Sequence, residues 1–265
     1  MNENQLKSHK EFVYLIKQSP AILALIFVAV IWYILTLIFP PYMFPPFTDI
    51  FKTIFSFYKN GDLWVNVYNT TWRVFVAFGT AVAMGTIVGM IMGFFSLMEA
   101  GIKPLLFVIQ TIASIVWCFF AVIWFSSTNF AVIFVVFIVG FPIITINVWE
   151  GTKNIDLGLE DMAKIFGVPQ KARIRGIIIP SVLPYIFAGI RSSLSYCWKV
   201  AILAELMVGM KGIGYWMNYS WGQAEFTEVY AWVLVMVVLM LMSEYLLIRP
   251  LEAWLMRWRP KRERG

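Results

Sequence analysis

The sequence predicts an all-α polytopic membrane protein with about six transmembrane helices. Hydrophobic residues make up 60% of the chain, charged residues make up only 14%, and the mean hydropathy is +0.76. Soluble domains contain closer to a quarter charged residues. A spanning helix needs about 20 mainly apolar residues, so a chain of 265 residues has room for about five to seven of them. We therefore expect one membrane domain with short loops.

The first third of the chain contains two expected spans and a surface helix. The first span runs from Ala21 to Phe39 and stops at a pair of prolines. An amphipathic helix follows, with Thr48 as the expected N-cap and Asn60–Gly61 as the expected end. An amphipathic helix of this kind typically lies along the membrane surface. The second span runs from about Asn66 to Phe95.

Three glycines of the second span recur every four residues. Gly85, Gly89 and Gly93 therefore share one helix face. Small residues on such a face let a neighbouring helix approach closely. Packing within one subunit is the favoured interpretation, and a contact between two subunits is the alternative.

Four further apolar segments complete the expected set of spans. Short polar breaks separate the second, third and fourth spans, a long polar loop lies between the fourth and fifth, and the segment 208–230 leads to the sixth. The four segments are Pro104–Phe125, Phe130–Trp149, Val182–Met207 and Ala231–Ile248.

The distribution of basic residues predicts the orientation of the chain. Six spans place both termini on one side, and the segments on that side hold fourteen Lys or Arg residues. The opposite segments hold only Lys52, Lys59 and Lys211. By the positive-inside rule, both termini are expected in the cytoplasm. The expected parts are a cytoplasmic tail at 1–19, a transmembrane domain at 20–249 with a cytoplasmic loop at 150–181, and a basic cytoplasmic tail at 250–265.

Composition argues against several classes of site. His9 is the only histidine, which removes histidine-based metal sites, catalytic triads and proton relays. Cys118 and Cys197 lie singly in apolar segments and form no CxxC pair. Despite a net charge of +6, the basic residues form no stripe of the kind that binds nucleic acid. The chain lacks a GxxxxGK[ST] phosphate loop, so we expect no ATPase activity and no cofactor in this chain.

The long polar loop has a pattern of its own between Asp161 and Pro180. Asp161–Phe166 is compatible with a helix, and an acidic residue is favourable at a helix N-terminus. Gly167 can end that helix in a left-handed conformation. Pro169 suits the first turn of a second, basic helix, which Pro180 is expected to interrupt. A solvated loop that only sets topology is the alternative.

The spacing in this loop resembles a signature of the membrane subunits of binding-protein-dependent ABC importers. That signature reads Glu-Ala-Ala-x-x-x-Gly, nine residues, then Ile-x-Leu-Pro. Asp161, Ala163, Gly167, Ile177 and Pro180 match it, whereas Met162 and Ile179 depart from it. The stretches LPYIFAGIRSSL, WKVAILAELM, GIGYWM and LEAWLMRW look like the branch that handles sulfonates, taurine and nitrate, so the similarity covers nearly the whole chain from about residue 40. That family often has a proline in the third span, where this chain has Trp117–Phe120.

The resemblance implies the MetI-like fold of type I importer permeases. The short cytoplasmic helix is then a coupling helix that docks on a separate ATPase. Two membrane subunits, identical or closely related, would sit over two ATPases that bind ATP and Mg, in the bacterial cytoplasmic membrane and its lipid. An extracytoplasmic binding protein would deliver a small anion such as a sulfonate, taurine, nitrate or bicarbonate. The expected coupling residues are Asp161, Met162, Ala163, Lys164, Phe166, Gly167, Ile177 and Pro180.

Charged residues within the apolar spans are the other candidates. An unpaired charge costs at least about 2.5 kcal/mol at the bilayer centre, so each needs a partner, water or an interface. Arg191 and Lys199 lie on roughly one helix face and suit the path of an anion. Pairing with a carboxylate such as Glu244 is the alternative. The candidates for the translocation path or gate are Arg73, Arg191, Lys199, Glu205, Gly212 and Gly214.

An ion-driven secondary transporter or channel is the alternative function. It would favour internal symmetry or filter-like backbone segments, and neither is apparent in the sequence. A membrane enzyme or assembly scaffold would need a cluster of Asp, His or Ser at one depth, which the sequence lacks.

Overall fold

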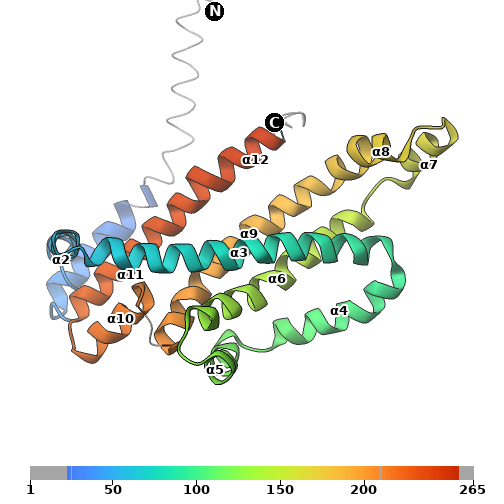
Figure 1. Ribbon diagram of the computed structural model, residues 1–265. Helices are drawn as coiled ribbons and strands as arrows, with labels where there is room; N and C mark the ends of the chain where they lie inside the picture. The colour runs from blue at the N-terminus through green and yellow to red at the C-terminus, as the bar shows by residue number, and fades with distance from the viewer. Residues whose placement is uncertain (1–22, 25, 209–210, 257–265) are drawn as a thin grey trace, which may run out of the picture.

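The computed structural model describes residues 23–24, 26–208 and 211–256, and every regular element among them is helical (Figure 1). The all-α prediction is therefore confirmed for this part of the chain. The expected tail at 1–19, and the part of the C-terminal tail after residue 256, lie outside the described residues. The labelled elements are α2 (Phe47–Asn60), α3 (Asp62–Phe94), α4 (Ser96–Thr111), α5 (Ser114–Phe125), α6 (Asn129–Lys153), α7 (Leu157–Ile165), α8 (Gln170–Arg173), η1 (Ile174–Ile178), α9 (Ile179–Val208), α10 (Ile213–Gly222), α11 (Phe226–Met242), η2 (Ser243–Ile248) and α12 (Arg249–Leu255).

Four of the described helices are long and apolar enough to cross a membrane. The bent pair formed by α4 and α5 would make a fifth span, and the helix Ile26–Ile38 in the expected first span is also apolar but shorter. A total of about six spans agrees with this count. The four long helices are Asp62–Phe94, Asn129–Lys153, Gln170–Val208 and Phe226–Leu255.

The centre of the fold is the packing of α3, α6 and α9, which run side by side (Figure 1). The glycine face of α3 lies directly against α6. A Cβ atom added at Gly89 would lie 2.6 Å from the Thr145 carbonyl oxygen, and one at Gly93 would lie 2.3 Å from Thr152 Cβ. Close packing within one subunit, the favoured interpretation of this face, is therefore confirmed.

The third span differs from its prediction. It begins at Ser96 and not at Pro104, and it breaks at Ile112 and Ala113 into α4 and α5, which meet at 96°. Both residues of the break have extended backbone conformations. Pro104 lies inside α4 without ending it, and nothing in the sequence at the break marks it as a bend.

Pro180 does not interrupt the basic helix that follows Pro169, contrary to expectation. α8, η1 and α9 form one continuous helix from Gln170 to Val208. A prolyl ring clashes with the carbonyl group four residues earlier in a regular α-helix. Here the turn directly before Pro180, η1, has the wider π-helical geometry, with the Ile179 N–H donating to the Ile174 carbonyl. The same arrangement recurs where η2 precedes Pro250, so the last span continues to Leu255 and does not end at Ile248.

The amphipathic helix α2 lies at one end of the bundle, together with α10 (Figure 1). It ends at Asn60, as predicted, because Gly61 adopts a left-handed conformation with φ of 81°. Its N-cap is Pro46, not Thr48, and no side chain caps it. Phe57 is buried and stacks on Trp232 of α11 with ring centroids 4.6 Å apart. We call this end the α10 end, and the opposite end, which carries α7 and α8, the α7 end.

Candidate functional site

The short helix α7 projects from the α7 end of the bundle (Figure 1). Asp156 caps its N-terminus, because the carboxylate accepts hydrogen bonds from the N–H groups of Gly158 at 2.9 Å and Leu159 at 3.3 Å. The helix therefore begins before Asp161, which lies inside it and not at its N-terminus as expected. Capping at this position stabilises the helix by about 1 kcal/mol.

Gly167 ends α7 in a left-handed conformation, with φ of 69°. The Val168 N–H donates to the Ala163 carbonyl at 2.9 Å, and the Gly167 N–H donates to the Lys164 carbonyl at 3.0 Å. This pair of hydrogen bonds defines a Schellman motif. The predicted turn is confirmed, and it fixes the direction in which the chain leaves α7.

The exposed surface of α7 carries large apolar side chains beside the charged Asp161 and Lys164. Ile165 and Phe166 are 83% and 79% exposed, and Met162 and Leu159 are also exposed. Large apolar side chains grouped on a small projecting element mark a contact surface. The expected coupling residues Met162 and Phe166 belong to this group, which we call the α7 ridge.

One ion pair links α7 to the base of the long helix, and two others lie within α7. Glu160 lies 3.8 Å from Arg173 of α8, and Lys164 lies 3.3 Å from Glu160 and 3.1 Å from Asp161. Hydrogen bonds to Asp161, the larger cause, and to Glu160 raise the pKa of Lys164.

The second half of the matched signature lies on the long helix, where Ile177 and Pro180 line one cavity together with Leu159 of the α7 ridge. Ile177 is half-buried and packs against the main core, and Pro180 lies inside the continuous helix. The two halves of the signature therefore have different surroundings, one exposed at the tip and one in the helix that carries the tip.

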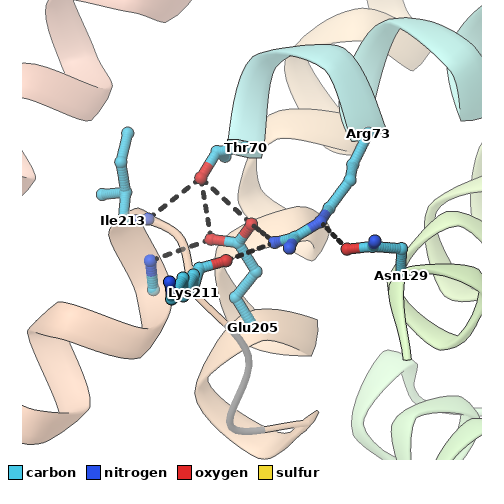
Figure 2. Close-up of polar contacts among 7 residues, drawn as sticks. Thr70, Arg73, Asn129, Glu205, Lys211 and Ile213 are labelled. Carbon is cyan, nitrogen blue, oxygen red and sulfur yellow. Dashed lines mark hydrogen bonds and ion pairs between the residues drawn. The ribbon is translucent and has the colours of Figure 1, made fainter. Parts of the chain in front are cut away.

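A second candidate site lies at the α10 end, where Glu205 of α9 is fully buried (Figure 2). Arg73 of α3 donates to its carboxylate at 2.7 Å, and Thr70 Oγ1 lies 3.0 and 2.9 Å from its two oxygens. The Gly214 N–H donates to Glu205 Oε2 at 3.0 Å. A buried ion pair is tolerated only when further hydrogen bonds satisfy both charges, and this one has them.

Arg73 extends the same network to two more elements (Figure 2). Its Nε donates to Asn129 Oδ1 at the start of α6 at 2.9 Å, and its Nη1 donates to the Lys211 carbonyl at 2.6 Å. The Ile213 N–H donates to Thr70 Oγ1 at 2.9 Å. The network therefore ties the start of α10 to α3, α6 and α9.

The two glycines predicted near a gate lie against Glu205. A Cβ atom on Gly212, whose φ is 149°, would lie 2.4 Å from Glu205 Oε1. One on Gly214 would lie 2.5 Å from the Ile202 carbonyl. Only residues without a side chain let the backbone approach the carboxylate this closely. Arg73, Glu205, Gly212 and Gly214 thus form one site, although their assignment to a path or gate stays a prediction.

Arg191 and Lys199 do not join this network. Arg191 pairs with Glu244 at 3.0 Å and with Glu252, so the alternative of carboxylate pairing describes its contacts. Lys199 is exposed, and no carboxylate oxygen of residues 23–24, 26–208 and 211–256 lies within 4.0 Å of its ammonium group. The two cations share a helix but have different electrostatic surroundings.

Sequence reasoning missed four residues that complete these sites. Thr70 and Asn129 bind the buried ion pair, Asp156 caps α7, and Glu252 pairs with Arg191. The spacing of Asp156 before a helix is a readable capping signal. Thr70 and Arg73, three residues apart in an apolar span, also mark one polar helix face. No group of three His, Cys, Asp or Glu within the described part of the chain could hold a metal ion.

Comparisons with known proteins agree with this architecture. The bicarbonate transport system permease protein CmpB of Synechococcus elongatus is 30% identical over 199 residues, which cover 75% of this chain and 69% of that protein. The nitrate import permease protein NrtB of the same species is 29% identical over 69% of this chain and 64% of that protein. The putative aliphatic sulfonates transport permease protein SsuC of Bacillus subtilis is 25% identical over 76% of this chain and 72% of that protein.

Solved structures show the same fold at lower sequence identity. An inward-facing MetNI methionine ABC transporter chain matches with a TM-score of 0.58 and 18% identity over 74% of this chain and 96% of that chain. A chain of an amino acid ABC transporter matches with a TM-score of 0.60 and 16% identity, covering 78% and 98%. Residues 81–257 match the family described as the inner membrane component of binding-protein-dependent transport systems. With this match over more than half of its length, the chain belongs to that family as a multi-pass inner-membrane transport subunit.

Proposed function

We propose that this chain forms the translocation path of an ABC importer for a small anion and that a separate ATPase drives it through α7. The observation that carries the proposal is the α7 ridge, an apolar surface on a helix that is capped at both ends. The Asp156 carboxylate caps the N-terminus of α7, and backbone hydrogen bonds at Gly167 and Val168 fix its C-terminus. The ion pair between Glu160 and Arg173 ties the helix to the long span. A force applied to α7 therefore reaches the membrane helices.

The proposed assembly has two membrane subunits over two ATPase subunits that bind ATP and Mg. The second membrane subunit is another copy of this chain or a close homologue. A binding protein delivers the solute on the other side of the membrane. In this arrangement the α7 end faces the cytoplasm, as the positive-inside rule also requires, and both termini lie there. ATP-driven closure of the ATPases moves the two α7 helices together and opens the path outward.

The α10 end is the proposed outer gate. Arg73, Glu205, Gly212 and Gly214 hold the start of α10 against three spans. Arg191 and its two carboxylate partners hold the fifth span against the sixth. The solute class follows from relatives named as bicarbonate, nitrate and aliphatic sulfonate permeases.

Gly167 offers a sharp test of coupling. A Cβ atom there would meet nothing within 4 Å, so a substitution acts only through the left-handed backbone. Gly167→Val should distort the exit from α7, because a β-branched residue is strongly disfavoured in that conformation. Gly167→Asn is the matched control, since Asn tolerates it.

The measurement is ATP-dependent uptake into proteoliposomes that contain the chain and the ATPase encoded alongside it, with the binding protein added outside. We expect Gly167→Val to insert and assemble but to lose solute-stimulated ATPase activity and uptake, while Gly167→Asn retains both. Normal coupling in the assembled Gly167→Val transporter would contradict the role of α7. Uptake by this chain alone, without ATP, would favour an ion-driven transporter or channel.

A further inference from the structure

The exposed faces of the spans differ in polarity. α3 and α11 present large apolar side chains such as Ile87 and Val237. α9 instead presents Ser192, Tyr196 and Lys199 along one exposed stripe. Apolar faces suit contact with lipid, whereas a polar stripe inside a span suits a water-filled path. We call the stripe from Ser192 to Lys199 the α9 stripe.

Lys199 lies deep in its span. It is nine residues before Val208, the last residue of α9, which corresponds to about 13 Å along the helix. A lysine at such depth is costly against lipid and is found facing a bundle interior or water. Since Lys199 is exposed in one subunit and lacks a carboxylate partner among the described residues, its ammonium group requires water or an anion.

A cavity borders the α9 stripe at the break between α4 and α5. It has a volume of about 300 Å³, and Tyr196 of the stripe forms part of its wall. Gln110 and Ser114, on either side of the break, contribute two more polar side chains. Among the described residues none of these three side chains makes a hydrogen bond, so their donor groups are free for a solute. Water occupies about 30 Å³ per molecule, so the cavity has room for a small solute and part of its hydration shell.

The charge of this region has one sign. Residues 104–125, which form most of the bent pair, contain no charged residue. The only acidic residue of α9 is Glu205, which is buried and paired with Arg73. Arg191, the other cation of α9, is neutralised by Glu244 and Glu252. The uncompensated charge on the α9 stripe is therefore that of Lys199, which attracts anions and repels cations.

We propose that the α9 stripe and the adjoining cavity form an intramembrane binding site for a small anion, an oxyanion or an organic sulfonate. Lys199 supplies the charge, and Tyr196, Gln110 and Ser114 supply hydrogen bonds. A lysine is a compact point charge without the fixed planar geometry of arginine, so it accepts anions of different shapes. This inference rests on the proposed function, because it assigns the solute class to a place in the translocation path.

The test uses two Ser→Cys variants as reporters, in each of which a sulfur atom replaces the serine hydroxyl oxygen. The two variants are Ser195→Cys and Ser192→Cys. Position 195 lies one turn from Lys199, and position 192 lies two turns from it on the same helix face. The full chain is placed in nanodiscs of phosphatidylethanolamine and phosphatidylglycerol at low ionic strength. Each reporter is labelled with an anionic reagent, 2-sulfonatoethyl methanethiosulfonate, and with its cationic trimethylammonium counterpart. The native cysteines are buried and give the background rate.

The measured quantity is the ratio of the anionic to the cationic labelling rate, with and without Lys199→Gln. One unit charge about 6 Å from the reagent in water changes each rate about threefold in opposite directions, so the ratio should fall about tenfold at Ser195→Cys. At about 10 Å, the distance of Ser192→Cys, the fall should be about fourfold. Methanesulfonate should slow anionic labelling at both reporters only when Lys199 is present.

Val237→Cys, on the apolar exposed face of α11, is the control and should label slowly with both reagents. Reporters that resist both reagents, or a ratio that Lys199→Gln leaves unchanged, would overturn the anion site. Full labelling without protection by methanesulfonate would also overturn it. Labelling requires neither ATP nor the ATPase. The labelling test can therefore contradict the anion site while the Gly167 test still supports coupling through α7, and the Gly167 test can contradict coupling while labelling supports the anion site.

Discussion

The buried pair of Arg73 and Glu205 allows a quantitative test of the α10 end. Glu205→Gln keeps the size of the side chain but removes its charge. Arg73 would then remain charged at 1% exposure with only neutral acceptors, the Lys211 carbonyl and Asn129 Oδ1. The amide nitrogen of the new glutamine is a hydrogen-bond donor. It would take the place of a carboxylate oxygen that accepts from either the Gly214 N–H or Arg73, so two donors would face each other. Removing one partner of a buried pair costs about 3–5 kcal/mol, and we expect a loss of this size.

The assay is denaturant unfolding of the purified chain in a mild detergent, followed by tryptophan fluorescence. Arg191→Gln is the matched control, because it also removes one member of a carboxylate pair. Its side chain is 46% exposed, so the loss should be only about 0.2–1 kcal/mol. High salt should reduce the effect of Arg191→Gln further but leave that of Glu205→Gln unchanged, since buried pairs are screened much less.

A double-mutant cycle separates the pair from its surroundings. Arg73→Met leaves the Glu205 carboxylate with only the Thr70 hydroxyl and the Gly214 N–H. The double variant removes both charges, so its cost should be smaller than the sum of the two single costs by at least about 2 kcal/mol. Additive single costs, or a Glu205→Gln loss no larger than that of Arg191→Gln, would refute the reasoning.

Two further predictions concern helix packing and capping. Gly89→Ala should destabilise the fold by about 1–3 kcal/mol, because its methyl group would lie 2.6 Å from the Thr145 carbonyl; the same unfolding assay should show no loss for Gly79→Ala, where nothing lies within 4 Å. Equal losses in these two variants would mean that α3 and α6 do not approach closely there. Asp156→Ala should cost α7 about 1 kcal/mol and increase amide hydrogen exchange at Gly158 and Leu159, whereas Asp156→Asn should largely preserve protection. Unchanged exchange in Asp156→Ala would rule out the cap.

The sequence predicted those features that depend on local chemistry. Gly167 ends its helix as expected, because few other residues adopt a left-handed turn without strain. The four-residue repeat of Gly85, Gly89 and Gly93 predicted close packing, and those residues do face α6. At Gly167 the steric reason is local, whereas the three glycines of α3 are needed because α6 lies against them.

Features that depend on distant contacts were not predictable in the same way. The bend at Ile112 and Ala113 has no glycine or proline to mark it, and Pro180 was expected to break a helix that a π-helical turn keeps continuous. Arg73 and Glu205 were recognised as charges that need partners, but their pairing joins residues 132 positions apart. The free-energy cost of burying a charged side chain in the membrane predicts that each charge has a partner. It does not predict which of several candidate residues that partner is.

The two candidate sites lie on one continuous helix. The helix Gln170–Val208 contains 39 residues, which corresponds to about 58 Å, and it carries α7 near one end and Glu205 near the other. The pair of Glu160 and Arg173 fixes α7 to its first turn, and the Glu205 network fixes α10 to its last turns. A rotation of this helix driven at α7 must therefore either carry α10, α3 and the start of α6 with it or break the buried network. Because breaking that network costs several kcal/mol, we expect these elements to move with the helix, and we expect bending to be confined to the π-helical turn at Ile174–Ile178.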